Sequence, residues 1–273
     1  MTRLARTADG TPLLGDDEGF VPLSAAAPDL VTVDDALRAA PGGLPDPAAA
    51  PAERVPDAEL TFGTPVDPGK LWGIGLNYAD HAEDLSAVRP DEPASFMKPR
   101  SAVTGPGGPI RLPPADQTER VTAEAELAVV FGRTCSGEVD PADVVAGFLP
   151  VVDMTAEDIL QRNPRYLTRA KSFDTFLVLG PWLWVPDEGW PDLDGVTVRT
   201  VVNGETVAEN TVSRMLFPPG ELVSFHARVM TLEPGDVIST GTPGAGVIEA
   251  GDHVRAEVDG VGTVEADVVS RND

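Results

Sequence analysis

Glu124-Ala125-Glu126-Leu127-Ala128-Val129-Val130-Phe131 joins a pair of carboxylates to an apolar run. The run from Leu127 to Phe131 predicts a buried strand. Residues two apart in a strand share a face, so Glu124 and Glu126 are expected to project together at its mouth. Carboxylates so close repel each other unless a cation lies between them, and such oxygen ligands suit Mg²⁺, Mn²⁺ or Ca²⁺. The alternative is a solvated strand start, which is common in an acidic protein.

Other predicted strands surround this one and outnumber the predicted helices. Two dipeptides, Asn203-Gly204 and Asp259-Gly260, are good hairpin turns. Many short strands with few helices favour a β-rich fold, either barrel-like or a rolled mixed sheet. The remaining strands are predicted at residues 71–76, 148–152, 177–185, 197–202, 236–240, 253–258 and 262–269, and helices at 156–161 and 221–231.

The chain divides by composition into two parts. Residues 1–68 are rich in Ala, Pro, Asp and Gly and predict a small N-terminal subdomain with a linker. A helix is expected there, beginning at Thr32 or Asp34. Residues 69–273 form the main domain, and the chain of 273 residues is near the upper size for one core.

Charge and cysteine content exclude several classes of function. The 44 Asp and Glu residues outnumber the 20 Lys and Arg residues, giving a formal net charge of −24. Such a surface repels phosphate backbones and anionic lipids, so we expect no nucleic-acid or membrane partner. Cys135 is the only cysteine, which excludes an intrachain disulfide and a cysteine zinc cluster. The N-terminus resembles no secretory signal and no apolar run is of spanning length, so we expect a soluble, cytoplasmic protein.

Asp153 follows the predicted strand at 148–152, where sites are often built. Thr155 and Asp158 stand at capping-box spacing, so we expect Thr155 to cap the next helix. That leaves Asp153 without a structural role. It is either a third metal ligand or a solvent-facing turn residue.

His81 and Asp84 share one face if the segment after Tyr78 is helical, whereas Glu83 faces elsewhere. A carboxylate that holds an imidazole raises its basicity, which suits a general base acting on water. The alternative is an exposed helix histidine with an ordinary charge partner.

A small-residue turn and two lysines can supply positive polarity for an anion. In the segment from Thr240 to Gly246, backbone N–H groups and the Thr242 hydroxyl can converge on a carboxylate. A plain turn is the alternative. Lys171 and Lys98 can add charge, or can be surface lysines.

Together and in this order, these motifs resemble the fumarylacetoacetate hydrolase family over about residues 71–269. The resemblance implies a β-rich α+β fold: a rolled, mixed, barrel-like β-sheet as the catalytic domain, usually assembled as a homodimer. The matching segments are Asn77-Tyr78-x-x-His81, Glu124-x-Glu126 with Asp153, Lys171-x-Phe173-Asp174, Met230-Thr231-Leu232-x-Pro234-Gly235-Asp236 and Gly241-Thr242-Pro243.

The resemblance also implies a set of roles and a reaction. A metal-stabilised enolate would form during carbon–carbon hydrolysis of an acylpyruvate-like 2-oxo acid. Asp84 stands where the family commonly has Glu, which keeps open decarboxylation, isomerisation or a lyase or cyclisation step on a related 2-oxo acid. The implied residues are Glu124, Glu126 and Asp153 for Mg²⁺ or Mn²⁺, His81, Asp84 and Lys171 for catalysis, and Tyr78, Gly241 and Thr242 for substrate binding.

Overall fold

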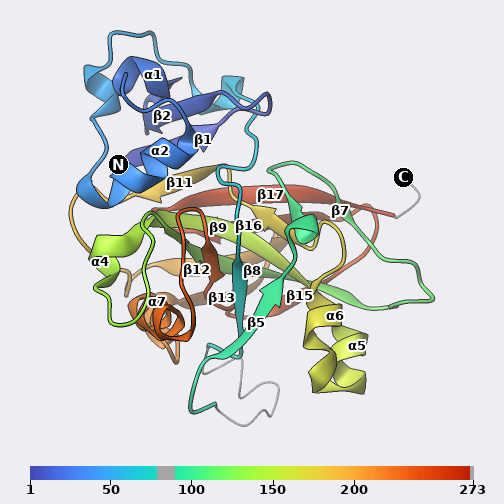
Figure 1. Ribbon diagram of the computed structural model, residues 1–273. Helices are drawn as coiled ribbons and strands as arrows, with labels where there is room; N and C mark the ends of the chain where they lie inside the picture. The colour runs from blue at the N-terminus through green and yellow to red at the C-terminus, as the bar shows by residue number, and fades with distance from the viewer. Residues whose placement is uncertain (79–89, 271–273) are drawn as a thin grey trace.

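The computed structural model describes residues 1–78 and 90–270 and is built on two β-sheets (Figure 1). The larger sheet runs in the order β3 (Gly19–Pro22), β2 (Pro12–Asp16), β1 (Thr2–Arg6), β11 (Trp182–Val185), β9 (Val145–Ala156), β8 (Val121–Phe131), β14 (Val237–Ser239), β4 (Leu71–Gly75) and β5 (Ala94–Lys98). Off this path, β10 (Leu177–Leu179) pairs with β9 and β6 (Val103–Thr104), and β15 (Ala245–Ile248) pairs with β8.

The smaller sheet packs against β8 and β9. Its five strands follow the order β13 (Glu205–Thr211), β12 (Thr197–Val202), β16 (His253–Val258), β17 (Gly262–Val269) and β7 (Ile110–Arg111). Both predicted hairpin dipeptides are confirmed, because Asn203-Gly204 connects β12 to β13 and Asp259-Gly260 connects β16 to β17.

Helices are short and lie outside the two sheets (Figure 1). In Figure 1, α5 and α6 lie together below β15, and α7 lies on the opposite side of the view. Among the described residues, no helix is long and apolar enough to cross a membrane. The α-helices are α1 (Leu23–Ala26), α2 (Val33–Ala39), α4 (Pro141–Val144), α5 (Glu157–Arg162), α6 (Leu167–Lys171) and α7 (Pro219–Val229). Single 3₁₀ turns span Ala40–Gly42, Pro47–Ala49, Asp57–Glu59, Arg100–Ala102, Pro164–Tyr166 and Val212–Arg214.

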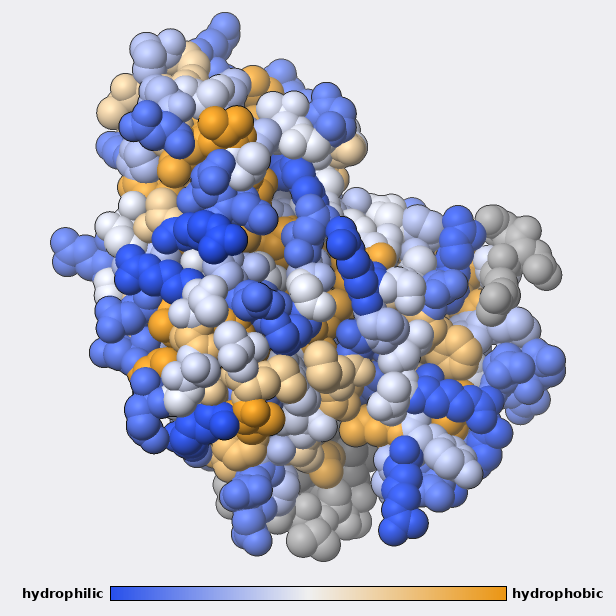
Figure 2. Space-filling view, in the orientation of Figure 1, coloured by the Kyte–Doolittle hydropathy of each residue, from blue (hydrophilic) through white to orange (hydrophobic). Residues whose placement is uncertain are grey.

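β8 and β9 form the centre of the molecule, and every residue in both strands is buried. Side chains of β8 alternate between two apolar clusters, as a strand requires. Leu127 and Val129 pack in the cluster shared with the smaller sheet, whereas Ala128 and Val130 pack in the cluster that includes the N-terminal helix α2. Hydrophilic side chains cover much of the surface in Figure 2, with apolar ones among them.

The N-terminal residues begin with a strand that joins the larger sheet. β1 pairs with β11 in antiparallel register, with Leu4 opposite Leu183. Within this region the expected helix is confirmed as α2, for which Thr32 is the N-cap and forms a capping box with Asp35.

Two expectations about the central strands differ from the structure. β8 starts at Val121 and β9 continues to Ala156, so the carboxylates lie inside both strands rather than at their ends. The expected cap at Thr155 is wrong, because α5 has no side-chain cap and Thr155 is a strand residue.

The β-rich α+β class is confirmed, but within the described residues the sheet order ends at β3 and β5, so closure into a barrel is not confirmed.

Asp236 fastens the start of β14 to the start of β4. Its carboxylate accepts hydrogen bonds from the backbone N–H of Lys70 at 2.7 Å and of Glu233 at 2.8 Å. The Lys70 ammonium lies 2.9 Å from the same carboxylate. Since Asp236 is buried, the two N–H groups depend on it for a partner, whereas the Lys70 ammonium also lies 2.9 Å from Glu233 Oε2.

We expect Asp236→Ala to lower the free energy of unfolding by about 3 kcal/mol, because it leaves two backbone N–H groups without a partner and removes one of the two carboxylates beside the Lys70 ammonium. Urea unfolding followed by circular dichroism measures the loss. Asp259→Ala is the control: Asp259 pairs with Arg199 but is half exposed, so its removal should lower stability by less than about 1 kcal/mol. Equal losses in the two variants would contradict the role given to Asp236.

Candidate active site

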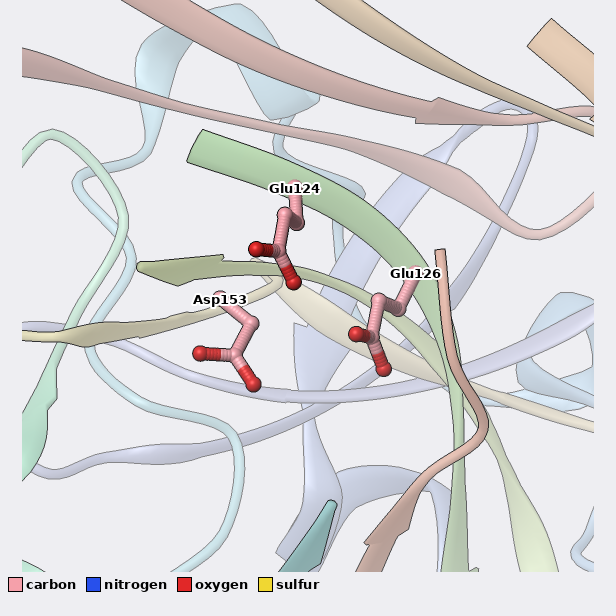
Figure 3. A group of neighbouring side chains, drawn as sticks. All are labelled: Glu124, Glu126 and Asp153. Carbon is pink, nitrogen blue, oxygen red and sulfur yellow. The ribbon is translucent and has the colours of Figure 1, made fainter. Parts of the chain in front are cut away.

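Three carboxylates from the two central strands point toward one another (Figure 3). One oxygen each from Glu124, Glu126 and Asp153 lies within 4.8 Å of the others. Glu124 and Glu126 share a face of β8, as predicted. The structure therefore brings together the three residues that the sequence assigned to a metal.

The pairing of β8 with β9 determines this arrangement. Glu124 lies directly opposite Asp153 in the antiparallel register. Directly opposed residues project from the same face of a sheet, with Cβ atoms about 5 Å apart. Asp153 is fully buried, so its interpretation as a solvent-facing turn residue is wrong.

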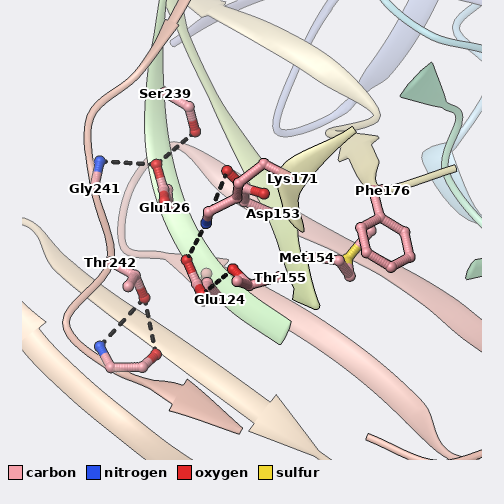
Figure 4. Close-up of polar contacts among 12 residues, drawn as sticks. Glu124, Glu126, Asp153, Met154, Thr155, Lys171, Phe176, Ser239, Gly241 and Thr242 are labelled. Carbon is pink, nitrogen blue, oxygen red and sulfur yellow. Dashed lines mark hydrogen bonds and ion pairs between the residues drawn. The ribbon is translucent and has the colours of Figure 1, made fainter. Parts of the chain in front are cut away.

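Lys171, at the end of α6, lies against this group of carboxylates (Figure 4). Its Nζ donates a hydrogen bond to Glu124 Oε2 at 2.7 Å and lies 3.4 Å from Asp153 Oδ2. Burial opposes the charged form, but Asp153, Glu124 and Glu126 together raise the pKa of Lys171 above its ordinary value. Lys171 is therefore a buried ammonium, and its interpretation as a surface lysine is wrong.

Lys98, at the end of β5, is a second buried lysine of the site. Its Nζ lies 2.5 Å from Asp153 Oδ1 and donates to the carbonyls of Lys171 and Phe176, both at 2.6 Å. The Met154 carbonyl lies at 3.3 Å. Burial lowers the pKa of Lys98, and the charge of Asp153 opposes that shift. All four neighbours are acceptors, which is the environment of an ammonium rather than of a neutral amine.

Glu126 is held by two donors from the opposite side of the site. Its Oε2 accepts from the Ser239 hydroxyl at 2.6 Å and from the Gly241 N–H at 2.7 Å (Figure 4). Burial, followed by the charge of Asp153, raises the pKa of Glu126 to about 8. Without a cation, this carboxyl therefore holds a proton at neutral pH.

The donor set fits a hard divalent cation. Oxygens bound to one Mg²⁺ or Mn²⁺ lie roughly 3–4 Å apart, so small side-chain rotations would bring these three onto one ion. Thr155 donates a hydrogen bond to Glu124 Oε1 at 2.5 Å, which orients that ligand. Burial and then the charge of Asp153 raise the pKa of Glu126, and a cation beside both carboxylates would stabilise their charged forms.

The turn after β14 passes beside the carboxylates, and its polar groups have partners inside the protein. Gly241 has φ +103°, and a Cβ there would lie 2.7 Å from Asn77 Cβ, so only glycine fits. Its N–H is used by Glu126. The Thr242 hydroxyl donates to the Gly244 carbonyl at 2.8 Å and accepts from the Gly244 N–H at 3.2 Å.

Tyr78 contributes a buried hydroxyl, whereas its neighbour Asn77 is structural. The Tyr78 hydroxyl has no hydrogen-bond partner within residues 1–78 and 90–270. Burial, followed by the charge of Glu126, raises the pKa of Tyr78. Asn77 donates to the Thr240 and Phe217 carbonyls at 2.6 and 3.0 Å, which ties β4 to the turn.

The predicted catalytic residues His81 and Asp84 lie outside the described residues. The other two histidines lie in α7 and in the smaller sheet. His226 is buried in α7 with its Nδ1 2.7 Å from the Leu222 carbonyl, and His253 lies in the β16–β17 hairpin.

Sequence reasoning missed two hydroxyl groups that hold the carboxylates, those of Ser239 and Thr155. Ser239 lies within a strand whose other residues are apolar, which is a weak signal for a buried hydroxyl with a partner. Thr155 was assigned to a helix cap because its spacing to Asp158 is that of a capping box.

Comparisons with known proteins identify related sequences and structures. Residues 70–269 match the family model described as fumarylacetoacetate (FAA) hydrolase C-terminal. The solved structure of a 5-carboxymethyl-2-hydroxymuconate delta-isomerase from Mycobacterium smegmatis is 36% identical and covers 98% of this chain and 99% of that chain, with a TM-score of 0.77.

Two further relatives differ from it in activity. The structure of a maleylpyruvate hydrolase from Sphingobium sp. SYK-6, in complex with manganese(II) ion and pyruvate, is 29% identical and covers 98% of this chain and 99% of that chain, with a TM-score of 0.77. The homoprotocatechuate catabolism bifunctional isomerase/decarboxylase of Escherichia coli is 38% identical over 80% of this chain and 51% of its own length. The relatives thus include isomerases, a decarboxylase and a hydrolase.

We expect Asp153→Asn to weaken Mn²⁺ binding at least about 100-fold, because it removes a charged oxygen ligand from the centre of the site. Isothermal titration calorimetry of the intact protein measures the change. Asp158→Asn is the matched control, because Asp158 lies nearby on α5 but pairs with Thr118 and Arg162. Unchanged Mn²⁺ affinity in folded Asp153→Asn protein would remove Asp153 from the ligand set.

Mn²⁺ binding should release about one proton at pH 7 and little above pH 9, because the pKa of Glu126 is raised to about 8 in the metal-free protein. The affinity should rise with pH up to that value, since the cation competes with a proton. Calorimetry in buffers of different ionisation enthalpy counts the released protons. In Glu126→Gln protein, this release should disappear.

Proposed function

The chain belongs to the fumarylacetoacetate hydrolase family, and from this premise we propose that it is a metal-dependent hydrolase of acylpyruvate-like 2-oxo acids. The reaction would consume water and yield a carboxylate, pyruvate and a proton. The observation that carries the proposal is the buried group of three carboxylates with Lys171 hydrogen-bonded to it.

The carboxylates fit one role in this reaction. A divalent cation held by Glu124, Glu126 and Asp153 would supply Lewis acidity beside the 2-oxo oxygen, where negative charge develops when the carbon–carbon bond breaks. Mg²⁺ and Mn²⁺ both suit these oxygen ligands. The Mn²⁺ and pyruvate in the hydrolase from Sphingobium support the same pairing of ion and ligand class.

The lysines set the electrostatics around that centre. Lys171 would stabilise the enolate as the bond electrons move onto carbon, and its burial strengthens that interaction. Lys98 acts indirectly, because it pairs with Asp153 and donates a hydrogen bond to the backbone carbonyl of Lys171. These fixed charges need no reorganisation when the reaction occurs.

The remaining roles follow from the family resemblance. His81, oriented by Asp84, would take a proton from water as it attacks the distal carbonyl. Tyr78 and Thr242 offer hydroxyl groups to the substrate. We further propose that the protein is a homodimer, because the family usually assembles in this way. We also propose that it acts in the cytoplasm.

A second candidate is isomerisation or decarboxylation of a related 2-oxo acid. The isomerase and isomerase/decarboxylase relatives favour it, and so does Asp84, which is one methylene shorter than the usual Glu. Both reactions pass through an enolate of a 2-oxo acid, but neither needs an attacking water.

Turnover of acetylpyruvate and of oxaloacetate, each with Mg²⁺, with Mn²⁺ and with chelator, separates these proposals. We expect metal-dependent cleavage of acetylpyruvate to acetate and pyruvate, measured by coupled pyruvate detection. In this assay, His81→Ala should abolish acetylpyruvate cleavage and leave metal affinity unchanged. Activity on oxaloacetate alone would support the second candidate. Full activity in chelator would contradict the metal-dependent mechanism.

A further inference from the structure

Thr200 is a polar residue in an apolar row. It lies on β12 in the smaller sheet and is fully buried, between Val198 and Val202 on the same inward face. This row packs against β8. A buried hydroxyl in such a row is unfavourable unless it is hydrogen-bonded, so its partners indicate its role.

The first partner of Thr200 is the strand that carries Glu124 and Glu126. On one side, β8 pairs with β15 up to Glu124 and with β14 from Ala128. The turn between β14 and β15 therefore interrupts the ladder beside Ala125. The Thr200 hydroxyl closes this gap by accepting the Ala125 N–H at 2.9 Å.

The second partner of Thr200 is the turn itself. The Thr200 hydroxyl donates to the Gly244 carbonyl at 3.1 Å. The same carbonyl accepts the Thr242 hydroxyl at 2.8 Å. Two hydroxyl groups thus share one acceptor, and either alone satisfies it.

We propose that Thr200 is a positioning residue that frees Thr242 to bind the substrate carboxylate. When the Thr242 hydroxyl turns from Gly244 to the substrate, Thr200 keeps the Gly244 carbonyl satisfied. Without the Thr200 hydroxyl, the buried Gly244 carbonyl would lose its last hydrogen bond when Thr242 turns to the substrate. The free-energy cost of that unpaired carbonyl would weaken substrate binding. This inference rests on the proposed function, in which Thr242 contacts the substrate.

The metal site should be nearly independent of Thr200. Glu124 is oriented by Thr155 and Lys171, and Glu126 by Ser239 and Gly241. Loss of the Thr200 hydroxyl should therefore change the pyruvate affinity and leave the Mn²⁺ affinity unchanged. A general loss of structure would lower both affinities.

Thr200→Val tests this, because valine keeps the shape and removes only the hydroxyl. For Mn²⁺-loaded protein, we expect the pyruvate Kd, measured by calorimetry, to rise five- to tenfold, and the Mn²⁺ Kd to change less than about threefold. KM for acetylpyruvate should rise by a similar factor while kcat changes less. Thr200→Ser, which retains the hydroxyl, should bind pyruvate within about twofold of the unmodified chain.

A double-mutant cycle with Thr242→Val ties the effect to the proposed partner. Once the Thr242 hydroxyl is gone, adding Thr200→Val should not weaken pyruvate binding further. Thr2→Val is the control: it also removes a threonine hydroxyl, which there bonds Asp187 at 3.2 Å, and it should leave pyruvate binding unchanged. If the valine variant does not fold, Thr200→Cys keeps the volume with a weaker donor and should raise the pyruvate Kd as well.

The role of Thr200 would be overturned if folded Thr200→Val protein bound pyruvate with unchanged affinity. It would also be overturned if the effects of Thr200→Val and Thr242→Val on pyruvate binding were additive. An equal loss of Mn²⁺ and pyruvate affinity would also overturn it, because the effect would then be on the whole site. If the unmodified Mn²⁺-loaded chain does not bind pyruvate, the proposed function fails and this inference fails with it.

Discussion

The antiparallel register of β8 with β9 is the constraint on which the site depends. It places Glu124 opposite Asp153, and the two-residue period of β8 adds Glu126 to the same face. A shift of one residue would move a carboxylate into an apolar cluster on the other face. The buried Leu, Val and Ala residues of both strands prevent that shift, so core packing and site geometry are determined together.

Burial of these charges requires compensation, and the chain supplies only part of it. Among the described residues, Lys98 and Lys171 pair with two of the three carboxylates, Asp153 and Glu124, whereas Glu126 is held by the neutral donors Ser239 and Gly241. One negative charge remains in excess, and it adds to burial, the first cause that raises the pKa of Glu126 to about 8. A divalent cation would leave one positive charge in excess, which suits a substrate with one carboxylate at that position.

Much of the fold and the ligand set could be predicted from sequence, because strand alternation and turn dipeptides are local signals. The strands at 197–202, 253–258 and 262–269 are confirmed at both ends, as are the neighbouring hairpins. Local signals failed at Thr155, where tertiary pairing extended β9 through an apparent helix cap. Lys98 and Thr200 gave little signal, because their roles depend on partners far along the chain, such as Phe176 and Ala125.

The separation of these partners along the chain has a consequence for the order of folding. Thr155 and Glu124 are 31 positions apart, and they lie on two strands that pair directly. Gly241 must find Glu126 across 115 positions. Contacts between nearby segments close smaller loops and lose less chain entropy. We therefore expect the carboxylates of β8 and β9 to gather before the turn after β14 docks on them, and a cation present during synthesis to favour the nascent strand pair.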